Sequence, residues 1–321
     1  MNILITGGAG FIGSNLADRL LEEGHKITVI DNFNSCYDVN IKEQNVKHNA
    51  ADSSYRLFRG DICDREFLEK IFKEKNFDAV IHLAARTGVR TSINEPSEYV
   101  KTNIEGTVCI LEQMRKTGVK KIIFASSGSV YGNCTAGKFS EDLKTSAPVS
   151  PYAASKSAGE QMIYAYSELY NIQAVCLRFF TVYGRRQRPD LAVRKFTELI
   201  EQDKPVPVYG DGSSIRDYTY IDDILNGIAA ALNYNKTLYE IINLGSGSEI
   251  RLKDMIAAIE KELGKKANIE YFPEQKGDVF RTAADITKAG LLLGYEPQTE
   301  FKEGIKKFIE WQRADITPAE N

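Results

Sequence analysis

Histidine and closely spaced cysteine are scarce in this sequence. Its 321 residues include three histidines and five cysteines, and these eight residues are scattered without a C-x-x-C pair. A protein zinc site needs several such ligands at short spacing, so we expect no metal site. The odd number of scattered cysteines argues against a disulfide framework and favours reduced thiols.

Long runs of one charge and long apolar runs are also missing. The net charge is −3 without any block of like charges, which argues against nucleic acid or an anionic membrane as a partner. No apolar run approaches the ~18 residues of a membrane span. The N-terminal residues lack the basic region and cleavage site of a secretory signal. We therefore expect a cytoplasmic protein whose partners are small molecules.

The first thirteen residues, MNILITGGAGFIG, carry the motif around which the chain is organised. Gly8, Gly10 and Gly13 fit the G-x-G-x-x-G pattern, and Gly7, Gly10 and Gly13 fit the wider G-x-x-G-x-x-G variant. Such glycines let the backbone approach a pyrophosphate, whose charge is held by free N–H groups at a helix N-terminus. A plain tight turn is the alternative. The apolar strand before the glycines and the helical spacing of leucines after them favour the dinucleotide motif.

Asp31 follows a second apolar segment, residues 27–30, which we predict to be a strand. An acid at this position suits the ribose hydroxyls of a dinucleotide. Asn32 and Phe33 come next and no arginine is adjacent, so a 2′-phosphate would be repelled. The sequence therefore favours NAD over NADP.

Strand and helix patterns alternate up to about residue 180 and become less regular afterwards. The alternation predicts an α/β fold with a Rossmann-type doubly wound parallel sheet. We expect an NAD-binding domain over residues 1–180, with residues 220–250 completing its sheet. Residues 181–321 should form mainly a smaller α/β domain that binds the substrate.

Tyr152 and Lys156 stand four residues apart at the start of a helix that we predict from Pro151 to Tyr170, with Ser150 as its N-cap. Both side chains should therefore emerge on one face. A neighbouring ammonium and the positive end of a helix dipole both lower the pKa of a phenol, so Tyr152 is a candidate proton carrier.

Ser127 ends a preceding strand and is placed to hydrogen-bond the hydroxyl that Tyr152 deprotonates. A simple turn serine is the alternative for this residue.

Taken together, these motifs resemble those of the extended short-chain dehydrogenase/reductases, in the NAD-dependent sugar-nucleotide epimerase/dehydratase family. The likeness covers nearly the whole chain, and its motifs occur in the family's order. These motifs are GGAGFIG, Asp31, Asp61-Ile62, LAA at 83–85, SSGSVYG, YAASK and RDYTYIDDI.

The resemblance implies a catalytic trio of Ser127, Tyr152 and Lys156, and Lys156 would also hold the nicotinamide ribose. In the second half, it implies that Tyr209 stacks on uracil, Arg216 binds the diphosphate and Asp278 binds the uridine ribose. A packed aromatic side chain and solvated charges are the alternatives there. The residues that we expect to bind NAD are Gly7, Gly10, Phe11, Ile12, Gly13, Asp31, Asn32, Asp61, Ile62, Leu83, Ala84, Ala85, Tyr152 and Lys156.

Two departures from the family's patterns indicate the reaction. Dehydratases of the family place Asp-Glu in the stretch occupied here by Gly128-Ser129, and the related decarboxylases keep a Glu where Ser129 stands. Without either acid, the chemistry that remains is reversible oxidation and re-reduction at one sugar carbon, which is epimerisation. Arg185 and Arg281 stand where the family has more ordinary residues.

Residues 178–192, RFFTVYGRRQRPDLA, are similar to the corresponding stretch of UDP-glucuronate 4-epimerases. Thr181 replaces the Asn that is usual in UDP-glucose epimerases. A sugar carboxylate needs hydroxyls or a cation, which Thr181, Arg186 and Arg90 are placed to supply. We expect Ser126 to line the same substrate site. The alternative reads Arg186 and Arg188 as solvated loop charges.

We therefore expect interconversion of UDP-glucuronate and UDP-galacturonate through a 4-keto intermediate, with transient hydride transfer to bound NAD. The alternatives are a UDP-glucose or UDP-N-acetylglucosamine 4-epimerase, a net sugar-nucleotide reductase and a non-catalytic NAD-sensing protein. Family members commonly pair the helices that begin here near Pro96 and Pro151, so the resemblance also implies a homodimer.

Overall fold

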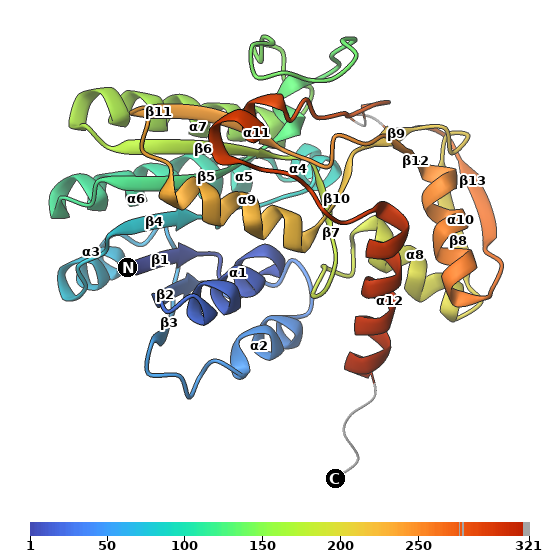
Figure 1. Cartoon of the computed structure of the whole chain (residues 1–321), viewed down its shortest axis with the longest axis horizontal. Coiled ribbons are helices and arrows are strands. Elements are labelled where there is room, and N and C mark those ends of the chain that lie inside the picture. The colour runs from blue at the N-terminus through green and yellow to red at the C-terminus, as the bar shows by residue number, and fades with distance from the viewer. Residues whose placement is uncertain (276, 278, 317–321) are drawn as a thin grey trace.

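A seven-stranded parallel sheet forms the centre of the computed structural model, which describes residues 1–275, 277 and 279–316 (Figure 1). The spatial order is β11-β6-β5-β4-β1-β2-β3, and every neighbouring pair is parallel. The doubly wound α/β fold is thereby confirmed. The strands are β1 (Asn2–Thr6), β2 (Lys26–Asp31), β3 (Tyr55–Arg59), β4 (Ala79–His82), β5 (Lys121–Ser127), β6 (Gln173–Phe179) and β11 (Tyr239–Leu244).

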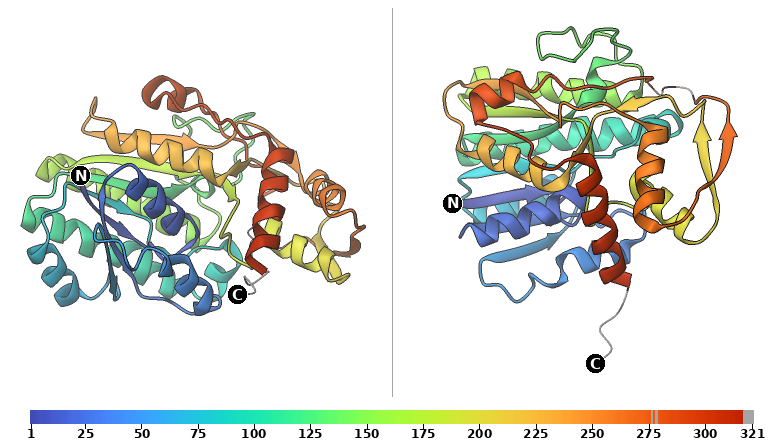
Figure 2. Two further views of the ribbon diagram at one scale, coloured as in Figure 1. Left: turned by 60° about the horizontal axis from the view of Figure 1, so that its bottom comes forward. Right: turned by 45° about the vertical axis from the view of Figure 1, so that its right-hand side comes forward.

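Helices cover both faces of this sheet (Figure 2). Leucines of α1 (Phe11–Glu22) and isoleucines of α9 (Ile221–Asn233) pack with one set of strand residues. The opposite set packs against α3 (Arg65–Glu74), α6 (Gly106–Thr117) and α7 (Pro151–Tyr170). Because both faces are covered, the central strands are buried on both sides, as the four buried residues of β4 show.

Side chains cap the starts of two helices, and the predicted Ser150 cap is confirmed. Asp64 accepts a hydrogen bond from the Phe67 N–H at the start of α3, and Ser150 accepts one from the Ala153 N–H at the start of α7. Pro151 occupies the first turn of α7, where a missing N–H costs nothing. These caps fix where α7 begins, and so where Tyr152 and Lys156 emerge.

The long helical pattern from Pro96 is helical throughout but is interrupted. A π-helical turn, η1 (Val100–Glu105), joins α5 (Pro96–Tyr99) to α6. The charged segment before β3 contains α2 (Val39–Lys47). The sequence patterns did not predict α4 (Val89–Asn94) or the 3₁₀ turn η2 (Gly128–Tyr131).

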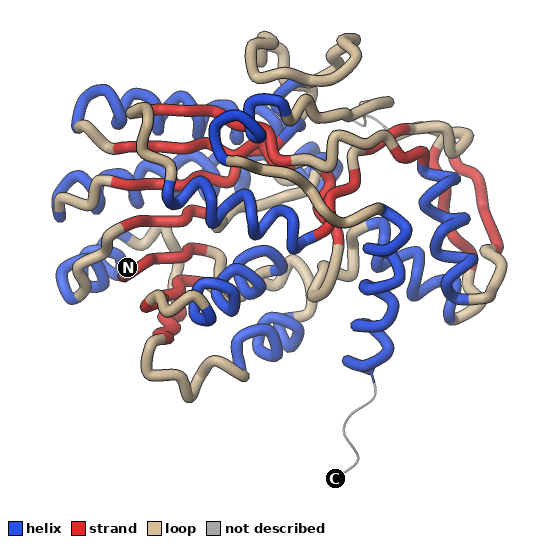
Figure 3. The backbone as a smooth tube through the Cα atoms, in the orientation of Figure 1, coloured by secondary structure: helices blue, strands red, loops and turns tan. Residues whose placement is uncertain are grey.

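Beyond β6 the chain builds a smaller group of elements beside the sheet, at the right of Figure 1. Figure 3 shows three short strand pairs there, joined by loops and flanked by helices. The pairs are β7 (Thr181–Tyr183) with β10 (Tyr218–Tyr220), β9 (Ile215–Arg216) with β12 (Ile250–Arg251), and β8 (Pro205–Tyr209) with β13 (Asn268–Phe272). The helices there are α8 (Ala192–Glu201), α10 (Leu252–Leu263) and α12 (Phe301–Ile316), whereas α11 (Thr287–Leu293) packs against β11 and α9 of the main sheet. Within the described residues, each helix is too short or too polar to cross a lipid bilayer.

Candidate active site

A cavity of about 500 Å³ lies at the carboxyl ends of the sheet strands, beside the point where the strand order reverses between β1 and β4. This is where open α/β sheets bind ligands. Sixteen of the residues singled out in the sequence line it together: Gly7, Gly10, Phe11, Ile12, Gly13, Asp31, Asn32, Ile62, Leu83, Ala84, Ala85, Ser126, Ser127, Tyr152, Lys156 and Thr181.

The glycine-rich turn forms one end of this cavity. Gly7 has a φ of +74°, and a Cβ built there would lie 2.8 Å from the Ala84 backbone nitrogen. A Cβ on Gly13 would lie 2.3 Å from the Gly7 carbonyl oxygen. Gly10 is the N-cap of α1 and has no side chain to satisfy its first N–H groups. The turn is therefore a cradle of backbone donors suited to a pyrophosphate.

Asp31 lies at the carboxyl end of β2 in a buried position. Its two oxygens accept hydrogen bonds from the Ala9 N–H at 3.1 Å and the Phe33 N–H at 2.8 Å. The Lys42 ammonium lies 4.0 Å away, and burial raises the pKa of Asp31 and lowers that of Lys42. The sequence analysis did not identify Lys42, because this lysine is distant from Asp31 in the chain and reaches it only through the position of α2.

Asp61 is held just beside the cavity lining. Its carboxylate accepts hydrogen bonds from the Asn32 amide at 2.9 Å and from the Cys63 N–H at 2.8 Å. The residues on either side of it, Gly60 and Ile62, line the cavity. Asp61 thus positions Asn32 and the turn after β3.

Tyr152 and Ser127 meet in the middle of the cavity. Burial raises the pKa of Tyr152, while the Ser127 hydroxyl and the Arg188 guanidinium act in the opposite direction. The expectation of a lowered pKa is therefore wrong for the chain alone. It failed because burial outweighs the charges that face the phenol.

Lys156 lies one helical turn further along α7 and is buried. Its ammonium donates a hydrogen bond to the Ala125 carbonyl at 2.7 Å and lies over the Phe124 ring. Burial lowers the pKa of Lys156 to about 7, against the effect of Glu160, which raises it. The lysine is therefore poised to change its charge near neutral pH.

The loop after β7 contains three arginines, and the structure separates their roles. Arg188 lines the cavity, is paired with Asp190 at 2.6 Å and hydrogen-bonds the Thr87 hydroxyl. Arg186, which we expected at the substrate, instead makes a 2.7 Å ion pair with Asp18 of α1. This geometry does not bring Arg186 to the cavity, because the turn at Gly184 and Arg186, with φ of +137° and +63°, directs the two side chains apart.

Residues from the two halves of the chain meet at the other predicted substrate positions. The Arg90 guanidinium, from α4, lies 4.3 Å from the centre of the Tyr209 ring at the end of β8. Arg216 lies on β9 and donates hydrogen bonds to the carbonyls of Ile215 and Phe280. Asp278 lies outside the described residues.

The two arginines that depart from the family's pattern lie in ion pairs. Arg185 pairs with Asp222, and Arg281 pairs with Glu249 and donates hydrogen bonds to the carbonyls of Ala136 and Gly137. Both tie loops to neighbouring elements. Ser126 lines the cavity, but its hydroxyl donates a 2.5 Å hydrogen bond to Glu160 behind the cavity wall.

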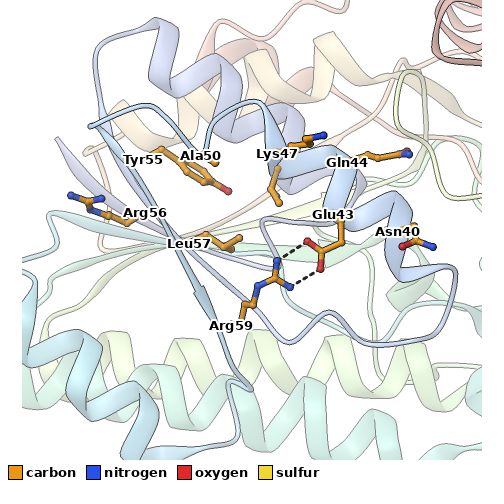
Figure 4. Close-up of a pocket in the computed structure, with 10 residues that line it drawn as sticks. Asn40, Glu43, Gln44, Lys47, Ala50, Tyr55, Arg56, Leu57 and Arg59 are labelled. Carbon is orange, nitrogen blue, oxygen red and sulfur yellow. Dashed lines mark hydrogen bonds and ion pairs between the residues drawn. The ribbon is translucent and has the colours of Figure 1, made fainter. Parts of the chain in front are cut away.

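A second cavity, of about 680 Å³, lies between α2 and β3 (Figure 4). Its polar side chains include Glu43 and Arg59, which form a bidentate ion pair with both contacts at 2.6 Å. These two groups satisfy each other, so the pair holds α2 against the edge strand. We therefore place the chemistry in the first cavity.

The arrangement in the first cavity supports oxidation and reduction of a carbinol. A dinucleotide laid along the glycine turn and Asp31 would bring its far end towards Ser127, Tyr152 and Lys156. A hydroxyl group, a phenol and an ammonium are the groups that a proton transfer coupled to hydride transfer needs. The cradle, the buried acid and the catalytic groups thus fit a nicotinamide dinucleotide.

Similar proteins have this fold and catalyse reactions of this kind. Residues 4–308 match the family model described as GDP-mannose 4,6 dehydratase. A UDP-glucuronate 4-epimerase of Thermodesulfobacterium geofontis is 43% identical over 315 residues, covering 98% of this chain and 96% of that protein.

Two crystal structures extend the likeness to the fold. The UDP-glucuronic acid 4-epimerase of Bacillus cereus, in complex with UDP-glucuronic acid and NAD, has a TM-score of 0.93 and 38% identity, covering 98% of this chain and 99% of that one. The UDP-glucose 4-epimerase of Thermotoga maritima, with UDP-glucose, has a TM-score of 0.90 and 34% identity, covering 99% and 100%. The chain therefore belongs to the family of the GDP-mannose 4,6 dehydratase model, among the extended short-chain dehydrogenase/reductases.

Proposed function

We propose that the protein is an NAD-dependent UDP-glucuronate 4-epimerase that interconverts UDP-glucuronate and UDP-galacturonate. The observation that carries this proposal is one cavity in which Ser127, Tyr152 and Lys156 lie between the dinucleotide cradle and a wall containing Thr181 and Arg188. The similarity to enzymes with this name supports the same substrate.

The catalytic residues divide the work of the reaction. Bound NAD supplies a hydride acceptor and returns the hydride, so no net oxidation occurs. Tyr152 takes the proton of the sugar C4 hydroxyl and later returns it, and Ser127 hydrogen-bonds the same oxygen. Lys156 is expected to hold the nicotinamide ribose and to favour the phenolate when it is charged.

The cavity wall also offers a site for the sugar carboxylate. Thr181 supplies a hydroxyl group, and Arg188 supplies a cation whose charge reaches Tyr152. Binding the carboxylate also restrains the C5 substituent while C4 is a ketone, when loss of carbon dioxide becomes possible. We therefore assign to Arg188 the carboxylate-binding role that we first expected for Arg186.

The first test is to incubate the protein with UDP-glucuronate and, separately, with UDP-glucose, and to identify the products by NMR. We expect UDP-galacturonate from the first and little conversion of the second. Faster turnover of UDP-glucose would instead support a neutral UDP-hexose 4-epimerase.

A matched pair of neighbouring arginines tests the carboxylate site. Arg188→Gln should lower kcat/KM for UDP-glucuronate by about 10- to 100-fold, since a charge-assisted contact contributes ~1.5–3 kcal/mol. Arg186→Gln serves as the control, because its guanidinium pairs with Asp18. Equal losses in the two variants, or an equal loss on UDP-glucose, would contradict this assignment.

We further propose that the chain works as a cytoplasmic homodimer with two functional parts. The five cysteines are unpaired thiols, which suits a reducing compartment. Apolar side chains exposed on α7 support self-association. Residues 1–180, with the sheet completed by residues 220–250, would bind NAD, and most of residues 181–321 would bind the UDP-sugar.

A further inference from the structure

Glu160 continues the spacing of the catalytic residues along α7. Tyr152, Lys156 and Glu160 stand four residues apart and so share one face of the helix. Glu160 is only 4% exposed and lies one turn further from the cavity than Lys156. The proposed mechanism leaves this buried carboxylate without a role.

Three elements meet at the Glu160 carboxylate. Arg178 of β6 donates hydrogen bonds to both of its oxygens, at 2.9 and 2.8 Å. Ser126 of β5, the register partner of Arg178, donates to Oε1 at 2.5 Å. The carboxylate therefore joins α7 to β5 and β6 at the point where β5 enters the active site.

The end of β5 is held at two consecutive residues by α7. Lys156 donates to the Ala125 carbonyl at 2.7 Å, and the next residue, Ser126, donates to Glu160. Ser127 follows directly. Its backbone position is thus set by two side chains of the same helix that presents Tyr152.

Arg178 is itself fixed on its far side. Its guanidinium donates to the Tyr131 hydroxyl at 2.9 Å, which in turn donates to the Asn243 side-chain oxygen at 2.7 Å. The network therefore reaches β11, and Arg178 is only 2% exposed. An arginine that is hydrogen-bonded on both sides holds the Glu160 carboxylate in place.

Among the titratable groups that face Lys156, Glu160 is the one that stabilises its ammonium. Burial lowers the pKa of Lys156 to about 7, and Glu160 acts in the opposite direction. His82, on β4, is neutral because burial lowers its pKa to about 3. Tyr152 is neutral in the chain alone because burial raises its pKa.

Among the titratable groups that face Glu160, Arg178 is the charged partner of its carboxylate. Burial raises the pKa of the Cys176 thiol and of the Tyr239 phenol, so both are neutral near pH 7. The Tyr239 hydroxyl donates to the Glu160 backbone carbonyl at 3.2 Å.

We propose that Glu160 is a positioning residue of this active site: anchored by Arg178, its carboxylate fixes the end of β5 that carries Ser127 and supplies the negative charge that keeps the Lys156 ammonium protonated. The inference deepens the proposed function, because it assigns the group that controls Lys156 in that reaction. Glu160 acts through Lys156 and Ser126, without touching the substrate.

The experiment reads the ionisation of Lys156 directly. The purified protein is labelled with ¹³Cε-lysine and titrated by NMR, and the Lys156 signal is identified by its loss in Lys156→Arg. In Glu160→Gln, the Lys156 midpoint should fall by at least about one pH unit, the effect of a nearby opposite charge. Glu160→Asp keeps the charge and should restore most of the shift. Glu74→Gln, at the exposed end of α3, is the control and should leave the midpoint unchanged.

A second variant guards against misfolding. Glu160→Gln leaves Arg178 buried without its partner, which is a destabilising change. Glu160→Gln/Arg178→Met removes both charges at similar volume and should also lower the Lys156 midpoint. An unchanged midpoint in a folded Glu160→Gln or double variant would overturn the proposal.

Activity provides a separate measurement. The dependence of kcat on pH is measured with UDP-glucuronate as the substrate. In each variant whose Lys156 NMR midpoint falls, the alkaline limb of this pH profile should also move to lower pH. A wild-type protein that fails to epimerise UDP-glucuronate would refute the proposed function, whereas the NMR titration would still decide the role of Glu160. A kcat profile that stays in place while the NMR midpoint moves would overturn the link between Glu160 and catalysis.

Discussion

Tyr152 reaches the cavity from the first turn of α7, and its environment explains why the cofactor matters to its chemistry. The chain alone raises the pKa of the phenol by burial. The phenolate therefore has to be favoured by the charge of Lys156, of Arg188 or of a bound oxidised nicotinamide. In the proposed reaction, the positive charge of the oxidised nicotinamide would favour the phenolate, and proton transfer would then depend on the bound cofactor.

The first prediction at this scale is that Tyr152→Phe lowers kcat by ~10²–10⁴-fold, since a general base typically contributes that much. The ring remains in its T-shaped contact with Tyr99, at 6.2 Å between centroids, so fold and NAD content should stay near wild type. Product formation followed by NMR measures kcat, and the absorbance of released NAD measures the NAD content. A variant that keeps more than about a tenth of the wild-type rate would show that another group transfers the proton.

Thr181 gives a second prediction at the residue scale. Thr181→Val keeps the shape of the β7 side chain and removes the hydroxyl that lines the cavity. We expect kcat/KM for UDP-glucuronate to fall by about 5- to 10-fold, because a hydrogen bond contributes ~1 kcal/mol or somewhat more to a charged partner. UDP-glucose should lose less. A similar loss on both sugars would remove Thr181 from the carboxylate site.

Tyr209 gives a third prediction at the residue scale, because another side chain already lies over its ring in the free chain. Arg90 lies over it at 4.3 Å, where the resemblance places a uracil. Tyr209→Leu should raise KM for the UDP-sugar by roughly 5- to 30-fold, because stacking of a base on an aromatic ring contributes ~1–2 kcal/mol. The value of kcat should change little. A lowered kcat with unchanged KM would place the base elsewhere.

At the scale of elements, the β1–α1 turn is the part of the site that the sequence predicted best. The glycine pattern and the strand before it are local, so their meaning does not depend on distant residues. The cap of α7 was predicted for the same reason. Side-chain directions in the loop after β7 depend on backbone turns at Gly184 and Arg186, which residue types alone do not specify.

Two glycines with similar backbone angles allow a controlled test of this turn. Gly7 and Gly24 have φ of +74° and +82°, but only the Cβ at Gly7 meets the Ala84 backbone, while that at Gly24 meets nothing within 4 Å. Gly24→Ala should cost about 1–2 kcal/mol of stability from backbone strain alone. Gly7→Ala should cost more and should also reduce the NAD retained on purification. Thermal unfolding and nucleotide content measure both effects, and equal behaviour of the two variants would contradict a close approach at Gly7.

At the scale of the molecule, contacts between distant segments explain what the sequence could not predict. Lys42 meets Asp31 because α2 folds back over β2, and Glu160 meets Arg178 because β6 lies beside β5. Burial raises the pKa of Tyr152 on α7, and the Arg188 guanidinium, from the second half of the chain, acts to lower it. These are long-range effects, whereas the motifs report local backbone geometry.

The exposed face of α7 also belongs to this scale. On α7, Leu169 is 70% exposed and Met162 is 39% exposed, whereas Ile163 of the same helix is buried in the core. Tyr166 donates a hydrogen bond to Glu112 of α6 at 2.7 Å, so the two helices present a joint surface. Leu111 of α6 is fully buried against the protomer's own sheet and so does not contribute to this surface.

The last prediction is that this joint surface of α6 and α7 forms a homodimer interface. A stable interface buries about 1,200–2,000 Å² in total, an area that the α6 and α7 surfaces of two protomers together can supply. Leu169→Lys should place a charge in the interface and shift the protein to monomer at micromolar concentration, measured by light scattering. Leu291→Lys is the matched control, because Leu291 is 76% exposed and belongs to α11, which packs against β11 and α9 rather than in the cluster that contains α7. A wild-type protein that scatters as a monomer, or a Leu169→Lys variant that stays dimeric, would show that the surface serves another purpose.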